Sequence, residues 1–180
     1  MTWLAIDLNH RYNELGATRD LEEAIVIARE AIDLCPAGHP DRSMSLNTLS
    51  VCLAIRYNQL GAMEDLGEAI VLHREALDLR PQGHPDRSMS LNNLAICLSA
   101  RCTQLGVMQD LNEAIVLARE ALDSRPQGHP DRTTSLNNLA AHLSSRYEKL
   151  GVMEDLDEAI FLDREALDLY PTGHPNRSMS

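Results

Sequence analysis

The apolar residues of the chain follow helical periods that alternate with short polar breaks. One stripe places leucines three, four and seven residues apart, at Leu91, Leu94, Leu98 and Leu105, which is the spacing of one helix face. A second stripe with helical spacing covers residues 111–122. The pattern predicts a first helix, helix A, of about 20 residues and a second, helix B, of about 15 residues.

Residues typical of helix ends lie between and after these stripes. Gly106 is expected to end helix A in a left-handed conformation. Asp110, with Glu113 three positions later, predicts the N-cap and capping box of helix B. Pro126 and Gly128 are expected to stop helix B before the next helix A begins.

A histidine recurs in the linker that joins helix B to the next helix A, always beside a proline. These histidines are His39, His84, His129 and His174. Because they recur together with the helix pattern, we expect a local role in capping or packing the linker.

The whole pattern repeats every 45 residues. The string Gly-His-Pro-Asp-Arg begins at Gly38, Gly83 and Gly128, and Gly-His-Pro-Asn-Arg begins at Gly173. A fixed period of this length is typical of repeat proteins, in which each unit buries its apolar face against its neighbours. The sequence therefore predicts an all-α fold, a single solenoid of four helix-turn-helix units and about eight helices. The units are residues 1–45, 46–90, 91–135 and 136–180.

The first and last units differ from the middle ones in a way that suggests a segment of a longer array. The first helix A has no linker before it, and the linker at 175–180 has no helix after it. Solenoids normally end in polar capping units. We therefore expect either head-to-tail self-association, with residues 171–180 of one chain near the first helix of another, or fraying of both ends in a monomer.

The conserved spacing within one unit resembles a known family. Ala114, Ala121 and Pro126 have the Ala-x6-Ala-x4-Pro spacing of the second helix of a tetratricopeptide repeat (TPR), and Leu94-Ala95 matches its first helix. The linker and the Leu91-Asn-Asn-Leu-Ala95 segment resemble the long repeats of the kinesin-light-chain type. The 45-residue form is also similar to arrays in fungal proteins that carry a CHAT domain or a nucleotide-binding signalling domain. The resemblance implies a right-handed superhelix with helix A lining its concave face, and a protein or peptide as ligand.

The net charge of the chain bears on which partners it binds, and its cysteines bear on the cellular compartment. The net charge of −11 argues against binding to nucleic acid and to anionic membranes. No segment resembles a membrane span or a signal peptide. The cysteines show no paired spacing, which favours reduced thiols and a cytoplasmic location. They are Cys35, Cys52, Cys97 and Cys102.

No motif in the chain predicts catalysis, a metal or a cofactor. Position seven of the successive units holds Asp7, Cys52, Cys97 and His142. Packed helices lie about 8–10 Å apart, whereas zinc needs every ligand within about 2.3 Å. We therefore expect packing roles for these side chains and no enzymatic activity.

One arginine recurs on the apolar stripe of helix A, and a charge there must be paired or must reach solvent. We expect Arg56, Arg101 and Arg146 to be largely buried in structural ion pairs. The expected partners are the glutamates of the same hairpins, Glu68, Glu113 and Glu158, with Glu75, Glu120 and Glu165 as the second choice. The alternative is an arginine ladder that binds a ligand.

Asparagines on helix A are the candidates for ligand contact, because an amide both donates and accepts hydrogen bonds. In kinesin-light-chain-like repeats, to which the chain is similar, an asparagine before the Leu-Ala pair contacts the peptide backbone. The predicted groove residues are Asn47, Asn92, Asn93, Ile96, Ser99, Asn137 and Asn138. The alternative for the asparagines is helix capping or simple exposure to solvent.

Two functions are compatible with the repeats. The first is a non-enzymatic protein- or peptide-binding scaffold that uses the concave helix A groove. The second is a structural or self-associating spacer segment of a larger multidomain signalling protein, without a groove ligand.

Overall fold

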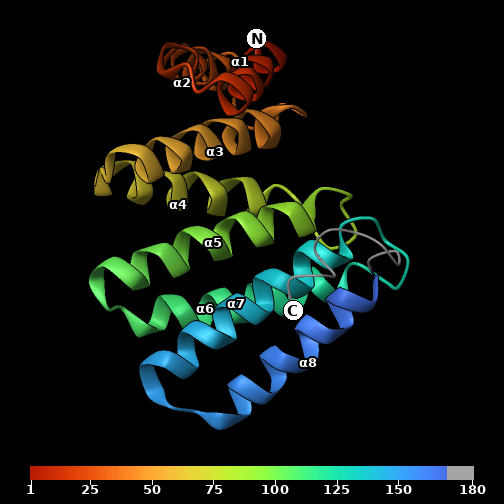
Figure 1. The fold of residues 1–180 in the computed structure, drawn as a ribbon. Coiled ribbons are helices and arrows are strands. Elements are labelled where there is room, and N and C mark those ends of the chain that lie inside the picture. Colours follow the sequence, from red (N-terminus) through yellow and green to blue (C-terminus); the bar gives the residue numbers. More distant parts are fainter. Residues whose placement is uncertain (170–180) are drawn as a thin grey trace. The chain divides into compact units, whose positions relative to one another are not determined.

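The computed structural model describes residues 1–169 of the 180-residue chain as helices joined by short turns (Figure 1). It divides into two compact units, Met1–Cys97 and Leu98–Ser180, with the boundary inside the fifth helix. The described residues contain no β-strand. The predicted all-α fold is therefore confirmed.

Eight helices make up the described part of the chain, as the repeat predicted. They are α1 (Thr2–Leu15), α2 (Thr18–Asp33), α3 (Arg42–Leu60), α4 (Met63–Asp78), α5 (Arg87–Leu105), α6 (Met108–Asp123), α7 (Arg132–Leu150) and α8 (Met153–Leu169). The odd-numbered helices are the predicted helix A and the even-numbered helices are helix B. The full-length helix A has 19 residues, whereas α1 has 14 because it lacks the first turns.

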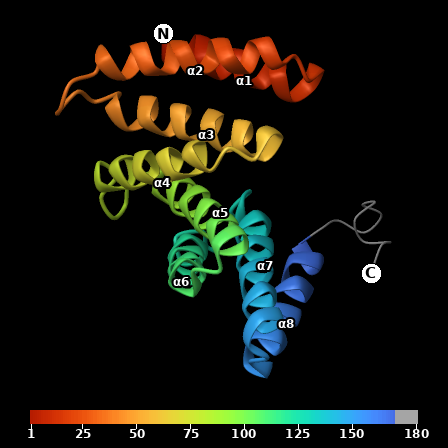
Figure 2. The ribbon, with the colours of Figure 1, turned by 90° about the vertical axis from the view of Figure 1, so that its left-hand side faces the viewer.

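In the first compact unit, consecutive helices pack as hairpins. The helix α1 packs on α2, α2 on α3, and α3 on α4, while α1 also contacts α3 (Figures 1 and 2). Ala24 and Ala69 on the helix B surfaces are fully buried. Small side chains at these positions let neighbouring helices approach closely, so that the leucines of helix A close the space between them.

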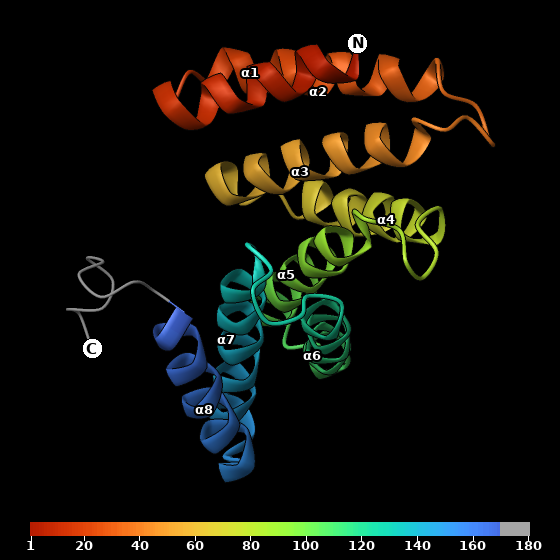
Figure 3. The ribbon, with the colours of Figure 1, turned by 90° about the vertical axis from the view of Figure 1, so that its right-hand side faces the viewer.

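The second compact unit repeats this arrangement. There α6 packs on α7 and α7 packs on α8 (Figure 3). Ala114 and Ala159 occupy the same position as the alanines of the first unit, and both are buried.

Glycine ends helix A as predicted, at the turn into helix B. Gly61 ends α3 with φ 70° and donates its N–H to the carbonyl of Tyr57. Gly106 has φ 71° and donates to the carbonyl of Cys102. A left-handed backbone is strained for residues with a Cβ atom, so glycine is favoured here.

The predicted N-cap at Asp110 is wrong. The helix α6 begins at Met108, its N-cap is Val107, and no side chain caps it. The carboxylate of Asp110 instead accepts two hydrogen bonds from Arg101. The position of Asp110 in the sequence favours a cap, but the guanidinium of Arg101 donates hydrogen bonds to both of its carboxylate oxygens.

Three of the four linker histidines have the local capping role that the sequence predicts for all of them. In each linker, Nδ1 of the histidine accepts the backbone N–H of the aspartate two residues later, at 3.1 Å. The pairs are His39 with Asp41, His84 with Asp86 and His129 with Asp131. His174 lies outside the described residues.

Residues 170–180 are also outside the described part of the chain. The predicted end-to-end contact through residues 171–180 therefore stays a prediction, as do the continuity of the four units and their boundary at 180. Within residues 1–169, no helix combines the length and the apolar character that crossing a bilayer requires.

Candidate functional site

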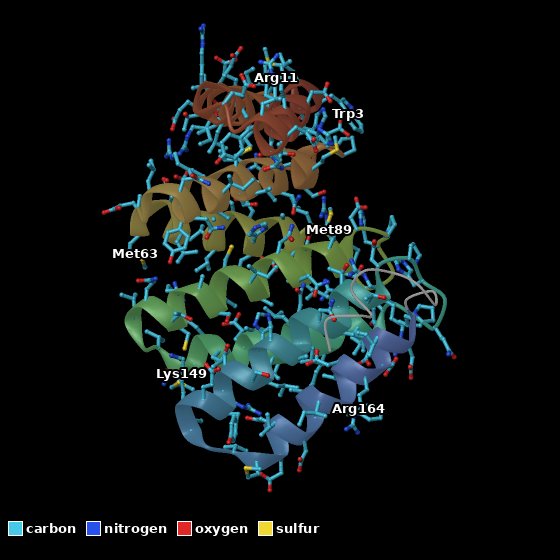
Figure 4. The ribbon with its side chains drawn as sticks, viewed as in Figure 1. Trp3, Arg11, Met63, Met89, Lys149 and Arg164 are labelled. Carbon is cyan, nitrogen blue, oxygen red and sulfur yellow. The ribbon has the colours of Figure 1, made fainter. Side chains whose placement is uncertain are left out.

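A surface groove of about 420 Å³ opens on the helix A side of the first compact unit. We call it the α1–α3 groove. The helix α1 contributes Trp3, Ile6 and Asn9, α3 contributes Met44, Asn47, Thr48 and Val51, and the region around the second linker contributes Arg80, Asp86 and Met89. Trp3 and Met89 project to the same side of the molecule (Figure 4). The volume lies in the range of about 300–1,000 Å³ that is typical of ligand sites.

Apolar side chains form most of the groove wall. The indole of Trp3 is 68% exposed and Met89 is 39% exposed, although both are large apolar groups. Ile6, Met44 and Val51 are half-buried between them. These side chains leave water-exposed apolar surface that a ligand can cover.

Two asparagine carbonyl oxygens in the groove lack a hydrogen-bond partner among the described residues. They are Oδ1 of Asn9 and Oδ1 of Asn47, and both atoms are buried. The Asn47 residue as a whole is only 9% exposed. A buried acceptor without a partner destabilises the folded chain, so these two oxygens mark the polar part of the groove.

Arg80 lies behind the groove and is almost fully buried, at 1% exposure. Its Nη1 donates to Oγ of Ser90 at 2.6 Å, and its Nη2 is 3.8 Å from the carboxylate of Asp86. Removal from solvent lowers the pKa of Arg80 more than the carboxylate of Asp86 raises it. The groove wall therefore holds both the guanidinium of Arg80 and the carboxylate of Asp86.

The sequence does not single out this buried arginine, because the residue type at its position differs between the first repeat and the next two. The equivalent residue in the first repeat is Cys35, whose sulfur lies 3.8 Å from Oγ of Ser45. In the second compact unit it is Arg125, which donates to Oγ of Ser135 at 2.8 Å. A serine recurs in the next helix A and contacts the cysteine or the arginine in each case, so this serine is the sequence signal for the buried position. The serines are Ser45, Ser90 and Ser135.

A smaller cavity of about 110 Å³ lies further along the same helix face. Asn93 and Ile96, both predicted groove residues, line it together with Asn58 and Val51. Asn93 is half-buried and Ile96 is exposed. The first compact unit therefore holds Asn47, Asn93 and Ile96 at two neighbouring cavities on helix A.

The other predicted groove residues lie in different environments. Asn92 is 4% exposed and does not present its amide to a groove, which corrects its assignment. Its Oδ1 is buried as well, and Asn92 lines neither of the two cavities described above. In the second compact unit Asn137 is exposed, whereas Ser99 and Asn138 are half-buried.

The arginine column forms ion pairs, but with partners other than those predicted. In each hairpin, the recurring arginine in the second half of helix A binds both carboxylate oxygens of an aspartate nine residues later, in the first turn of helix B. The pairs are Arg11 with Asp20, Arg56 with Asp65, Arg101 with Asp110, and Arg146 with Asp155. Two of the expected partners bind other arginines instead: Glu68 binds Arg29 and Glu158 binds Arg119.

The hairpin turn explains this partner choice. It brings the last turns of helix A next to the first turn of helix B, where the aspartate lies, while the glutamate is one turn further on. The side chains of Arg56, Arg101 and Arg146 are 23%, 30% and 24% exposed, so most of each side chain is buried and the rest reaches solvent. The hydrogen bond from Arg146 lowers the pKa of Asp155, outweighing the opposing effect of burial.

The glutamates join successive repeats. Glu68 binds Arg29 of the preceding helix B, and Glu158 binds Arg119 in the same way. The linker arginine forms the second connection: Arg42 binds Glu75 and also donates to the carbonyl of Cys35. Arg132 binds Glu165 equivalently. These are structural pairs between neighbouring helices, not a ligand-binding ladder.

Two of the thiols and two buried imidazoles are poorly suited to nucleophilic chemistry. Burial raises the pKa of Cys52 to about 11 and that of Cys97 to about 12, which keeps both protonated at neutral pH. Burial also lowers the pKa of His73 and of His142 to about 4. The described residues contain no cluster of side chains that could hold a metal ion.

Stacked helical hairpins with glycine-ended helices and a repeated linker define a helical repeat fold of the TPR-like kind. Residues 42–86 match the tetratricopeptide repeat family model, which confirms the resemblance inferred from the sequence. No curated protein sequence matches the chain.

Two crystal structures share the fold. Both are of a candidate kinesin light chain of Podosopora anserina that is built of nearly identical TPR-like repeats, one of them in a variant form. The variant is 19% identical with a TM-score of 0.71, and the other is 21% identical with a TM-score of 0.68. Each match covers 96% of this chain and 78% of the other.

Proposed function

We propose that the chain is a non-enzymatic scaffold that binds a protein or peptide through the helix A face of its repeats. The α1–α3 groove, with its exposed apolar wall and its two unpaired asparagine oxygens, is the observation that carries the proposal. Proteins built from this repeat commonly serve as interaction scaffolds. A location in the cytoplasm is part of the proposal, supported by four unpaired cysteines.

A direct test screens the chain against an array of short, end-blocked peptides and measures binding of the selected peptides by titration calorimetry. Replacement of Asn93 and Asn138 together by alanine should weaken binding if these amides contact the peptide. The matched control is Val71→Ser on α4, where the side chain is 63% exposed on helix B, away from the helix A face. It should bind as the parent does.

The alternative, a structural spacer without a groove ligand, draws support from the ion pairs that join successive repeats. The same screen separates the two functions. If no peptide binds the parent chain by calorimetry, the scaffold is contradicted and the spacer function stands.

A further inference from the structure

We propose that the hairpin turns form an edge through which the chain binds a second copy of itself. This turn edge consists of the leucine that precedes each helix-ending glycine, and of two charged residues beside the first turn and two beside the last. The leucines are Leu15, Leu60, Leu105 and Leu150, and the charged residues are Glu14, Arg19, Lys149 and Glu154. None of them lines the α1–α3 groove, so the inference goes beyond the proposed peptide binding.

The leucine of the turn edge is exposed in every hairpin. Its exposed fraction is 72% at Leu15, 68% at Leu60, 59% at Leu105 and 56% at Leu150. One exposed leucine is common on a protein surface, but here the same leucine returns in each of the four turns. Glycine already ends helix A, and a polar residue such as glutamine has nearly the same helix propensity. The hairpin itself therefore does not require leucine, and a repeated exposed apolar surface marks an interaction site.

Within each compact unit, the two turns lie side by side. In the first unit α1 contacts α3, and Nη1 of Arg56 on α3 donates to the carboxylate of Glu22 on α2 at 2.9 Å. In the second unit, Nη1 of Arg146 on α7 donates to Oδ1 of Asn112 on α6 at 3.1 Å. Because packed helices lie about 8–10 Å apart, each unit presents two leucines as neighbours on its turn edge.

Charged side chains stand beside the first and last turns with their signs exchanged. Glu14 on α1 has the same repeat position as Lys149, which Figure 4 shows at the end of α7, and Arg19 on α2 has the same position as Glu154 on α8. All four side chains are exposed. Arg19 and Lys149 make no ion pair within residues 1–169, whereas the recurring arginine of helix A is paired in each hairpin. These two cations are therefore available to a partner.

A second copy of the chain matches this arrangement. If two turn edges meet in opposite directions, Glu14 faces Lys149 and Arg19 faces Glu154 of the other copy. If they meet in the same direction about a two-fold axis, Glu14 faces Arg19 and Lys149 faces Glu154. Opposite charges meet in both alignments, and the leucines fall into register because both copies have the same repeat period. A partner without this period would leave part of the leucine row uncovered.

The remaining acids and the net charge set the conditions for association. Glu64 and Glu148 also stand beside turns, and in the opposite-direction alignment they face the neutral Gln109 and Asn13. The net charge of −11 repels a second copy at long range. At about 0.15 M salt the screening length is about 8 Å, so this repulsion is largely removed while residues in contact still attract each other.

Sedimentation equilibrium of the full chain at this ionic strength tests the proposal, over concentrations from about 1 µM to about 1 mM because a small contact gives weak association. We expect the mass to rise to that of a dimer and no further, since a two-fold contact closes on itself. Leu60→Gln combined with Leu105→Gln should weaken the dimer about tenfold or more. The matched control combines Val71→Ser with Val116→Ser, which removes equally exposed apolar side chains from helix B and should leave the dimer unchanged.

Charge exchange then assigns the alignment. Arg19→Glu should weaken the dimer about tenfold, because an attractive pair becomes a repulsive one in each half of the contact. Adding Glu154→Lys should restore the dimer if the edges meet in opposite directions. Adding Glu14→Lys should restore it if they meet in the same direction. In each case the other addition should weaken it further.

The proposal is overturned if the parent stays monomeric at every concentration, if the leucine variant associates as the parent does, or if neither added substitution restores the dimer. Growth beyond a dimer that the leucine variant does not change would assign association to the chain ends instead, and would also overturn it. Binding of peptides at the groove is measured separately, and none of these results contradicts it.

Discussion

At the scale of single residues, side chains that recur in every repeat stabilise the hairpins, whereas several residues of the candidate groove occur in one repeat only. The arginine–aspartate pair occurs in all four hairpins. By contrast, Asn9 and Trp3 belong to the groove but stand at positions that the other repeats fill differently. A repeat pattern therefore identifies structural residues more readily than ligand contacts.

The first prediction at this scale concerns the pair of Arg101 with Asp110. Both hydrogen bonds of the pair are charge-assisted, and Asp110 is only 4% exposed. Asp110→Ala should lower the free energy of unfolding by about 1.5–3 kcal/mol, less than a fully buried pair because Arg101 reaches solvent. Chemical denaturation of Arg101→Ala, Asp110→Ala and the double variant measures the coupling energy between them. Asp123→Ala, an exposed acid of α6, is the control and should change the free energy by less than about 0.5 kcal/mol.

The second prediction concerns the pH dependence of stability through His73. Burial lowers the pKa of His73 to about 4, and its Nδ1 lies 3.0 Å from Oγ of Ser50. The unfolded chain, with a histidine pKa near 6.5, binds a proton in the interval where the folded chain does not. The free energy of unfolding should therefore be complete above about pH 6.5 and fall by roughly 3 kcal/mol towards pH 4 through this residue.

His73→Gln should reduce the slope in that interval by about half in urea unfolding at a series of pH values, because His142, whose pKa burial also lowers to about 4, still contributes there. His10→Gln, which replaces an exposed histidine of α1, should leave the slope as it is in the parent. Equal slopes in the parent and His73→Gln would contradict the assignment.

At the scale of elements, helix lengths and helix ends follow local rules. Both the end of helix A at glycine and the helix period of the leucines were predicted correctly, because backbone strain and side-chain spacing act within a few residues. Helix B begins earlier than the sequence predicts, at Met108. Asp110 can either cap a helix or bind an arginine, and the position of Arg101 decides for the second.

A pair of glycine substitutions should change stability in opposite directions. Gly61→Ala puts a Cβ atom on a backbone with φ 70° and should destabilise the chain by about 1 kcal/mol. Gly67→Ala, inside α4 and with no heavy atom within 4 Å of the new Cβ, should stabilise it by about 0.5–1 kcal/mol. Thermal melts of both variants check the signs. Two shifts of the same sign would contradict the helix-end assignment.

At the scale of the whole molecule, the ion pairs between successive repeats should limit how far local unfolding of one repeat extends to its neighbours. In repeat proteins each unit contacts only its neighbours, so that stability is approximately a sum of unit and interface contributions. Arg42 contacts both the end of the first hairpin, at the carbonyl of Cys35, and Glu75 of the second hairpin. Its loss should weaken one interface and leave distant repeats unaffected.

Amide hydrogen exchange tests this locality. Arg42→Ala should accelerate exchange in α1 and α2, with little change in α7 and α8. Arg132→Ala is the reciprocal variant, since it removes the equivalent pair with Glu165, and it should accelerate exchange in α7 and α8 instead. A uniform acceleration by either variant would show that the chain opens as a single cooperative unit.

The repeat, the helices and the TPR-like fold follow from the sequence, because the period, the glycine positions and the alanine spacing are local features that recur in each repeat. The sequence also identified Asn47 as a residue of the helix A face. Three other features emerge from the folded chain: which acid binds each arginine, the burial of Asn92, and the position of Arg80 at a groove. These outcomes depend on which side chains meet across a hairpin or between neighbouring helices, and burial and hydrogen-bond geometry in three dimensions settle that choice.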